Sequence, residues 1–350
     1  MTGLTISIHN EIQTLTRVAV NSPGEEIARM RPEDFPRSLF DDILSPSETI
    51  SEHDVLRNVL EDSGAEVTNI RQILEEAFKA APKSDRVDLL ERVSIAAGNH
   101  SLAMELADWD PAELVPALTS GLAWARVGQK MPSLARLRAT HHAPNDMALQ
   151  PIANLMFMRD PCISIYDTIV PSRMTYAARR REPLIVGFAL RWGMGVAAEQ
   201  FLEIPHQQDE PHRYSSFEGG DFLVLSDEAL AIGSSQRTSP QAIERLSTLL
   251  MERHPKLQRV YAVLMPEERS MMHLDTILSQ ADHEHFLGYL PLITGQGFGD
   301  PLKVALLERD RPPRLVERMT VHDVLRDEFG DNVRVVSCGG SDPVNQAREQ

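Results

Sequence analysis

Residues 217–232 read Phe217-Glu-Gly-Gly-Asp-Phe-Leu-Val-Leu-Ser-Asp-Glu-Ala-Leu-Ala-Ile232. The apolar runs at 221–225 and 229–232 predict two neighbouring β-strands. The paired glycines before them let the backbone bend tightly between two carboxylates. Glu218 therefore lies beside a sharp turn, from which its side chain can point away from the strand ends. A turn that only leads into a strand needs no function, so the motif alone leaves both interpretations open.

Strand and helix patterns alternate on both sides of this stretch. Each is recognised by its apolar periodicity and by the turn residues that bound it. The predicted strands are 17–20, 65–70, 162–165, 260–263 and 333–336, and the predicted helices are 51–64, 188–202, 239–253 and 316–329. This alternation favours an α/β architecture.

A continuous helical pattern from 71 to 130 predicts a separate helical subdomain. Its clearest helix starts at Asp110-Pro-Ala-Glu113, where Asp110 is the expected N-cap and the proline occupies the first turn. Apolar residues continue that helix as far as Leu122. In the helix at 51–64, Ser51 is the expected N-cap and Gly64 marks the expected end.

The composition is that of a folded globular protein, since 42% of the 350 residues are hydrophobic and 25% are charged. Acidic residues outnumber basic ones by 51 to 35, and the net charge of -16 disfavours binding to nucleic acid or to an anionic membrane. No apolar run of about 18 residues and no signal peptide is visible, so a cytoplasmic location is expected. The two cysteines, Cys162 and Cys338, form no disulfide framework or zinc pattern and are interpreted first as ordinary buried thiols.

Two further motifs carry ionisable groups. Asn154-Leu-Met-Phe-Met-Arg-Asp160 places a carboxylate just before a predicted strand, where it either stabilises a turn or grips a cation. In Met271-Met-His-Leu-Asp-Thr276, an extended backbone would point His273 and Asp275 to one face, although a structural histidine remains the alternative. A single histidine among scattered carboxylates disfavours a metal site.

Arginines follow two of the predicted strands, in Ala178-Arg-Arg-Arg-Glu182 and Ser234-Ser-Gln-Arg-Thr238. Such a charge run usually forms a solvated helix face. Alternatively, an arginine at a strand end binds a substrate carboxylate through a bidentate fork. Carboxylates, a histidine and arginines together suit a small zwitterion with a cationic head and a carboxylate tail.

The order and spacing of these motifs resemble those of the arginine deiminases, which belong to the guanidine-modifying amidinotransferase superfamily. The resemblance covers essentially the whole chain. It also rests on Arg17-Val-Ala-Val20, Leu39-Phe-Asp-Asp-Ile43, Ser337-Cys-Gly-Gly340 and Arg348-Glu-Gln350. It implies a five-unit pseudosymmetric α/β propeller with a helical insertion. Residues 1–70 would form the first propeller segment, 71–147 the insertion, and 148–350 the remaining units, the last of them incomplete.

The resemblance also implies roles for individual residues in the hydrolysis of L-arginine to L-citrulline and ammonia, without a metal or organic cofactor. Asp160 and Asp275 would hold the substrate guanidinium. Glu218 would orient His273, which would protonate departing ammonia and then activate water. The implied substrate-binding residues are Asn154, Phe157, Arg179, Arg237 and Asp221.

The nucleophile of the family is a cysteine close to the carboxyl terminus, beyond the Arg-Glu-Gln stretch with which this sequence ends. Neither Cys162 nor Cys338 aligns with it. Two explanations are a shortened product of an arginine deiminase and a natural short homologue that only binds arginine; a deiminase or amidinotransferase for another guanidine compound is a third reading. An incomplete last unit would expose a strand edge, so reduced stability or self-association into a homo-oligomer is expected.

Overall fold

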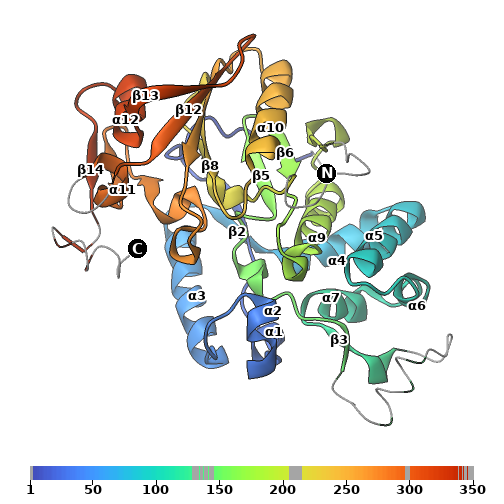
Figure 1. The fold of residues 1–350 in the computed structure, drawn as a ribbon. Helices are drawn as coiled ribbons and strands as arrows, with labels where there is room; N and C mark the ends of the chain where they lie inside the picture. The colour runs from blue at the N-terminus through green and yellow to red at the C-terminus, as the bar shows by residue number, and fades with distance from the viewer. Residues whose placement is uncertain are drawn as a thin grey trace. The chain divides into compact units, whose positions relative to one another are not determined.

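The computed structural model describes residues 3–127, 134, 137, 141, 146–204, 215–295, 300–337, 339, 340, 342 and 345. Within them the chain has a mixed α/β fold, shown in Figure 1. It divides into two compact units that interleave along the sequence. Unit 1 comprises Met1–Thr5, Leu15–Cys162 and Tyr176–Gln200, and unit 2 comprises Ile6–Thr14, Ile163–Thr175 and Phe201–Gln350.

Unit 1 is mainly helical. Its helices are α1 (Glu25–Ala28), α2 (Phe35–Ser38), α3 (Pro46–Asp62), α4 (Ile70–Ala80), α5 (Lys83–Ala96), α6 (Leu102–Leu106), α7 (Pro111–Thr119) and α9 (Glu182–Phe188). Two small sheets accompany them: β1 (Arg17–Val20) runs parallel to β2 (Glu66–Asn69), and β3 (Leu122–Ala123) pairs with β4 (Met147–Leu149) in the antiparallel sense.

Helix α4 lies at the centre of the unit 1 core because its apolar side chains recur at helical spacing. The buried residues on it are Ile70, Ile73, Leu74, Ala77 and Phe78. Its first turn is capped by the Asn69 side chain, which accepts the Arg71 N–H at 3.0 Å. The π-helical turn Ala189–Gly193 after α9 packs closely on α4, where a Cβ on Gly193 would lie 2.2 Å from the Ile73 carbonyl oxygen. Only glycine fits that contact.

Most of the predicted elements of unit 1 are confirmed, but their ends differ. Helix α3 begins at Pro46, with Ser45 in the N-cap position, so the prediction of Ser51 as N-cap was wrong. The Asp110 cap is confirmed, because its carboxylate accepts the Ala112 N–H at 2.9 Å. Leu122 lies in β3 and not in the helix, which ends where Gly121 adopts φ of 90°.

The predicted helix at 188–202 is not continuous. Helix α9 ends at Phe188, and a π-helical turn and a 3₁₀ turn at Ala198–Gln200 follow it. A single α-helix was therefore wrong for this stretch. None of the described helices is both long and apolar enough to cross a membrane.

Unit 2 is built on a five-stranded sheet of order β13-β12-β9-β8-β7. Its strands are β7 (Phe222–Val224), β8 (Ala229–Ser234), β9 (Arg259–Leu264), β12 (Lys303–Glu308) and β13 (Arg314–Thr320). Only β8 and β9 run parallel. The smaller sheets are β5 (Cys162–Ile165) with β6 (Thr168–Pro171), and β10 (Leu278–Gln280) with β11 (His285–Gly288) and β14 (Arg334–Val336).

Both faces of the five-stranded sheet are buried, because alternate side chains of its strands enter different cores. Leu230 and Val260 pack with α10 (Pro240–Arg253), whereas Ala231 and Tyr261 pack with α12 (Val321–Phe329) and near α11 (Leu290–Thr294). Figure 1 shows α10 and α12 beside different parts of this sheet. The near-continuous apolar runs seen in the sequence are the signature of such a sheet.

An N-terminal arm, defined here as Ile6–Thr14, belongs to unit 2. Ile8 forms an antiparallel bridge with Tyr166. The Glu11 carboxylate accepts the Val224 N–H of β7 at 2.8 Å, and His9 contacts Asp227 at 2.5 Å. Among the described strands, β7 lies at the edge of the sheet and pairs only with β8. The arm therefore supplies an acceptor for the Val224 N–H on the open side of this strand.

The strands predicted around 217–232, at 260–263 and at 333–336 are confirmed, as is the helix at 239–253. The helix predicted at 316–329 begins only at Val321, because residues up to Thr320 belong to β13. A capping box between Thr320 and Asp323 marks this start. The propeller and its segments 1–70, 71–147 and 148–350 stay predictions.

Candidate active site

The predicted site residues of unit 1 gather around one buried guanidinium, that of Arg179. We call Asn154, Asp160, Arg179 and Glu182 the arginine cluster. Arg179 donates from Nη1 to Asp160 Oδ2 at 2.6 Å and from Nη2 to Glu182 Oε2 at 2.8 Å. Its Nε also donates to Glu182 Oε2 at 3.0 Å, and its Nη2 to the Asn154 carbonyl oxygen at 3.3 Å. Arg179 is 3% exposed and Glu182 0%, so these ion pairs are shielded from water.

Local structure explains how these residues meet. Arg179 ends a 3₁₀ turn and Glu182 begins α9, so their separation of three residues places them on one side of a helical turn. Asp160 lies just before β5, as predicted, and Asn154 lies in a 3₁₀ turn, Ala153–Met156. The Asn154 amide donates to the Ser38 carbonyl oxygen at the end of α2, at 2.7 Å. Glu182 was absent from the predicted site, although its spacing from Arg179 was a usable signal.

Two carboxylates of the arginine cluster, those of Asp160 and Glu182, accept from the one guanidinium of Arg179, and the buried Arg181 guanidinium also lies within electrostatic range of Glu182. Arg179 contacts carboxylates of the protein, and its predicted contact with a substrate carboxylate stays a prediction. Phe157, predicted to bind substrate, is 51% exposed.

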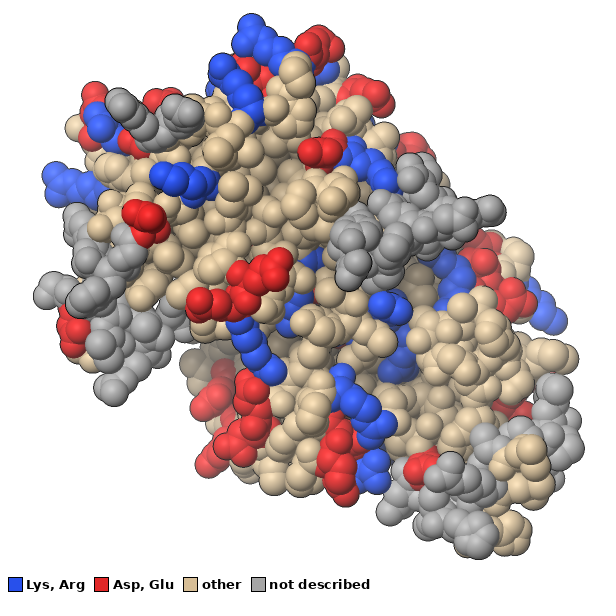
Figure 2. Space-filling view, viewed as in Figure 1, with Lys and Arg blue, Asp and Glu red and all other residues tan. Residues whose placement is uncertain are grey.

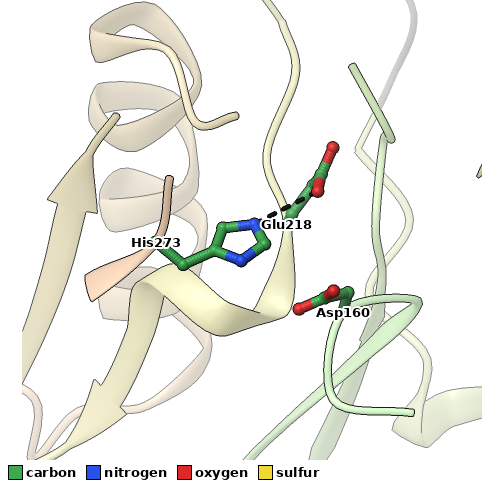
Figure 3. A group of neighbouring side chains, drawn as sticks. All are labelled: Asp160, Glu218 and His273. Carbon is green, nitrogen blue, oxygen red and sulfur yellow. Dashed lines mark hydrogen bonds and ion pairs between the residues drawn. The ribbon is translucent and has the colours of Figure 1, made fainter. Parts of the chain in front are cut away.

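The predicted site residues of unit 2 gather around one buried carboxylate, that of Glu218. We call Glu218, Arg237 and His273 the histidine cluster. Glu218 Oε2 accepts Arg237 Nη1 at 3.0 Å and His273 Nε2 at 3.1 Å, the contact drawn in Figure 3. Since an ionised carboxylate only accepts, Nε2 of His273 carries the proton in this contact. Glu218 Oε1 accepts the Thr175 N–H at 3.0 Å.

The chain holds each member of the histidine cluster in a turn. Glu218 precedes the 3₁₀ turn Gly219–Asp221, and its own N–H donates to Thr238 Oγ1 at 3.1 Å. Arg237 lies between β8 and α10, where the Ser235 hydroxyl accepts its N–H at 3.0 Å. His273 precedes a second 3₁₀ turn, Leu274–Thr276. Arg237 and His273 both donate to Oε2 of Glu218, and Thr175 donates to Oε1. Both oxygens of this carboxylate are therefore poorly placed to coordinate a metal cation.

The predicted pairing of His273 with Asp275 required an extended segment and was wrong in that respect. The extended backbone ends at His273, and Asp275 lies within the 3₁₀ turn. A titratable partner of His273 in the structure is Glu218, 55 residues earlier in the chain. A contact across this distance in sequence cannot be derived from local periodicity.

Asp221, predicted to bind substrate, is fully buried beside the histidine cluster. Its Oδ1 accepts the Leu274 N–H at 3.0 Å, and its Oδ2 accepts the Ser235 hydroxyl at 2.7 Å. Burial raises the pKa of Asp221 to about 7, although His273 and the hydrogen bonds act in the opposite direction.

The cysteine that the structure describes fits the prediction of an ordinary thiol. Cys162 is free, half-buried at the start of β5, and packs against the unit 1 core. Burial raises the pKa of its thiol, which disfavours the nucleophilic thiolate. Cys338 and Arg348-Glu-Gln350 lie outside the described residues.

Charges on the surface are mixed. On the face drawn in Figure 2, acidic and basic side chains of the described residues lie interspersed, without a broad patch of one sign. The concentrated charge described above is instead buried.

Comparisons with known proteins agree on one family. A family model described as arginine deiminase matches residues 37–350. Arginine deiminases of Listeria monocytogenes serotype 4a (strain HCC23) and Bacillus cereus (strain B4264) are 31% and 30% identical to this chain, with 99% of this chain and 83% and 84% of theirs aligned.

Solved structures give more distant matches. A DDAH from Pseudomonas aeruginosa in complex with citrulline is 12% identical, with a TM-score of 0.43 over 79% of this chain and 69% of its own. The amidinotransferase SxtG from Microseira wollei is 16% identical, with a TM-score of 0.45 over 81% of this chain and 69% of its own.

Proposed function

Since the chain belongs to the arginine deiminase family, we propose that it hydrolyses L-arginine to L-citrulline and ammonia. The observation that carries this proposal is the family match over residues 37–350. The two buried clusters give it a chemical basis, because one is suited to a guanidinium and the other to proton transfer. No step of this reaction requires oxidation or reduction, and water supplies the oxygen of citrulline.

Guanidinium binding falls to carboxylates. Asp160 already accepts a guanidinium N–H of Arg179 at 2.6 Å, which supports its suitability for the same group on a substrate. Asp275 is proposed as the second carboxylate. Phe157, with half of its surface exposed, is proposed to cover the planar cation through its ring face. Asn154, Arg179 and Arg237 are proposed to recognise the substrate carboxylate.

Proton transfer falls to His273. The Glu218 carboxylate at 3.1 Å stabilises the protonated imidazole, so His273 can hold a proton and give it to departing ammonia when the C–N bond breaks. The neutral imidazole can then take a proton from water as the water attacks the same carbon. This proton from water restores the protonated imidazole of His273 and completes the cycle.

The remaining requirement is a thiolate that attacks the guanidinium carbon and is released when water attacks. Cys162 is poorly suited to this step, because burial raises the pKa of its thiol. We propose that Cys162 is a packing residue in this protein. The position of the nucleophilic thiol is therefore a separate experimental question.

The proposed fold is the five-unit α/β propeller with a helical insertion at 71–147. It is supported by the regular spacing of the ionisable motifs, since Asp160, Glu218 and His273 follow one another at intervals of 58 and 55 residues. An experimental structure with fewer or more than five repeated units would contradict it. Self-association is proposed as well, and light scattering over a range of concentrations tests it.

The decisive experiment measures citrulline formation from L-arginine by the full chain and by the Cys162→Ser and Cys338→Ser variants. Turnover that survives Cys162→Ser is expected. Turnover that survives both substitutions together would exclude a thiolate of this chain as nucleophile. Agmatine, which lacks the carboxylate of arginine, is the matched control substrate, and equal turnover of agmatine would contradict the proposed roles of Arg179 and Arg237.

Arginine binding without turnover is the second candidate function, and it is favoured by the unsuitable thiol of Cys162. Calorimetric binding that is lost in Asp160→Asn, with no citrulline formed by any preparation of the full chain, would identify it. In that outcome the arginine cluster keeps its proposed role and the histidine cluster loses its own.

A further inference from the structure

Asp221 holds the backbone beside His273 from a buried position. Its Oδ1 accepts the N–H of Leu274, which belongs to the peptide bond that follows His273, at 3.0 Å. Glu218, three residues before Asp221, accepts a hydrogen bond from Nε2 of the His273 ring at 3.1 Å. The turn Glu218-Gly-Gly-Asp221 therefore contacts the same histidine twice, once at its ring and once at its main chain. These two contacts together restrict both the position and the orientation of the imidazole.

The neighbouring strand leaves room for this carboxylate. Gly233 of β8 lies against Asp221, and a Cβ at that position would be 2.4 Å from Oδ1. The other oxygen, Oδ2, accepts the Ser235 hydroxyl at 2.7 Å. Both of these donors to Asp221, Ser235 and Leu274, thus come from the segments that carry Arg237 and His273. A larger residue at position 233 would collide with the Asp221 carboxylate in its present position.

We infer that Asp221 is a positioning residue for His273, which it serves by fixing the peptide bond after the histidine and so keeping the imidazole against Glu218. The inference deepens the proposed function and rests on it, because positioning matters only if His273 transfers protons. Asp221 is fully buried among protein donors, which supports this role over direct contact with substrate. Asp221 does not itself touch the reacting atoms in this account.

Charge adds to the geometric argument. The titratable and charged residues on the three segments that meet here are Glu218, Arg237, His273 and Asp275. Burial raises the pKa of Asp221 to about 7, and His273 partly offsets that effect. Protonation of Asp221 weakens its hydrogen bond to the Leu274 N–H, since a carboxylate is the stronger acceptor. The imidazole should therefore be held most firmly above pH 7.

The test is an NMR titration of the His273 ring in the full chain, with His273→Gln used to assign its signals. Asp221→Asn keeps the shape of the side chain and removes its charge, whereas Gly233→Ala keeps the charge and displaces the carboxylate. Asp227→Asn is the matched control, because it removes an aspartate from the turn between β7 and β8 that contacts His9 and Lys256 instead.

Asp221→Asn is expected to lower the pKa of the His273 imidazole by about 1, through loss of a nearby negative charge. Gly233→Ala is expected to move the ring signals at constant pH, and Asp227→Asn to leave them unchanged. Ring signals that are identical in wild type and a folded Asp221→Asn would overturn the inference. If that variant does not fold, the wild-type ring must show a second inflection near pH 7, and its absence would overturn the inference equally.

The readout needs no turnover, so this test is separate from that of the proposed function. A protein that forms no citrulline still reports whether Asp221 governs the His273 ring. In an active protein, Asp221→Asn should lower kcat more than it raises KM, because positioning of the proton donor acts mainly in the transition state.

Discussion

The two buried clusters are charge mirror images. In the arginine cluster one guanidinium lies between two carboxylates, Asp160 and Glu182, whereas in the histidine cluster one carboxylate lies between two nitrogen bases, Arg237 and His273. The first holds a permanently charged cation between two acceptors. The second can lose or gain one proton and remain paired, since Arg237 stays bound to Glu218 in either state.

The two clusters differ in whether a member changes its charge with pH. Arg179 keeps its charge at all relevant pH values, so its cluster is a fixed receptor. Glu218 pairs with a histidine that can gain or lose a proton, so the net charge of its cluster can change. Removing the centre of either cluster leaves like charges facing each other in a buried place.

Glu218→Gln should have the largest effect, because it removes the carboxylate that accepts from both Arg237 and His273. We expect the free energy of unfolding to fall by about 3–5 kcal/mol. Citrulline formation should fall by at least about 100-fold. Urea denaturation measures the first effect. Glu244→Gln on the exposed face of α10 is the matched control and should change stability by less than about 0.5 kcal/mol. Equal stabilities of the two variants would break the contrast.

Asp221→Asn should change how stability depends on pH. The pKa of Asp221 is about 7 in the folded protein and about 3.9 in the unfolded chain, so the folded state holds the extra proton between these values. Wild-type stability from this group is therefore present below about pH 4 and is lost as pH rises toward 7. The variant lacks this loss, on the order of 2–4 kcal/mol across the window.

The measurement for Asp221→Asn is urea denaturation at several pH values between 4.5 and 8. The difference between variant and wild type should grow with pH and become constant above about pH 7. Parallel stability curves would show that Asp221 titrates normally. They would also remove the electrostatic support for its positioning role, while leaving the hydrogen bond to Leu274 to be tested separately.

Glu182→Gln should be milder than Glu218→Gln, because Asp160 remains to balance Arg179. We expect a loss of about 1.5–3 kcal/mol in unfolding free energy, the scale of hydrogen bonds to charged groups. Arginine binding should weaken because one negative charge beside Asp160 is removed, and calorimetry measures the affinity. A loss as large as that of Glu218→Gln would mean that Asp160 does not share the guanidinium as the distances indicate.

Arg179→Lys should have the smallest effect on the fold. An ammonium keeps the charge but cannot engage Asp160 and Glu182 through separate N–H groups of one rigid plane. Arginine affinity is expected to fall by roughly tenfold, which corresponds to about 1.4 kcal/mol. Arg245→Lys on α10 is the control, and an unchanged affinity in Arg179→Lys would exclude the planar fork as a requirement.

The sequence predicted residue types and order better than contacts. Asp160, Glu218, Arg237 and His273 were recognised from their motifs, and the strands next to them are present because apolar runs of this kind are buried on both faces of a sheet. Glu182 was missed because a charge run is usually solvated, although here it is fully buried. The contact of His273 with Glu218 depends on pairing between distant segments, which local patterns do not contain.

The error at 316–320 also arose because a contact between distant segments decides the structure there. The part of β13 from 316 to 320 was assigned to a helix, because only its pairing with β12 identifies it as a strand. The capping box of Thr320 and Asp323 was a local signal that would have corrected the start of α12.

The N-terminal arm affects how the protein folds during its synthesis. Glu11 and His9 are made early, yet their partners Val224 and Asp227 follow 213 and 218 residues later. At synthesis rates of roughly 5–20 residues per second, the arm waits on the order of 10–40 s before its strand exists. Until β7 is made, the Glu11 carboxylate lacks the backbone N–H that it accepts in the folded protein, so the arm docks only after most of the chain has been synthesised.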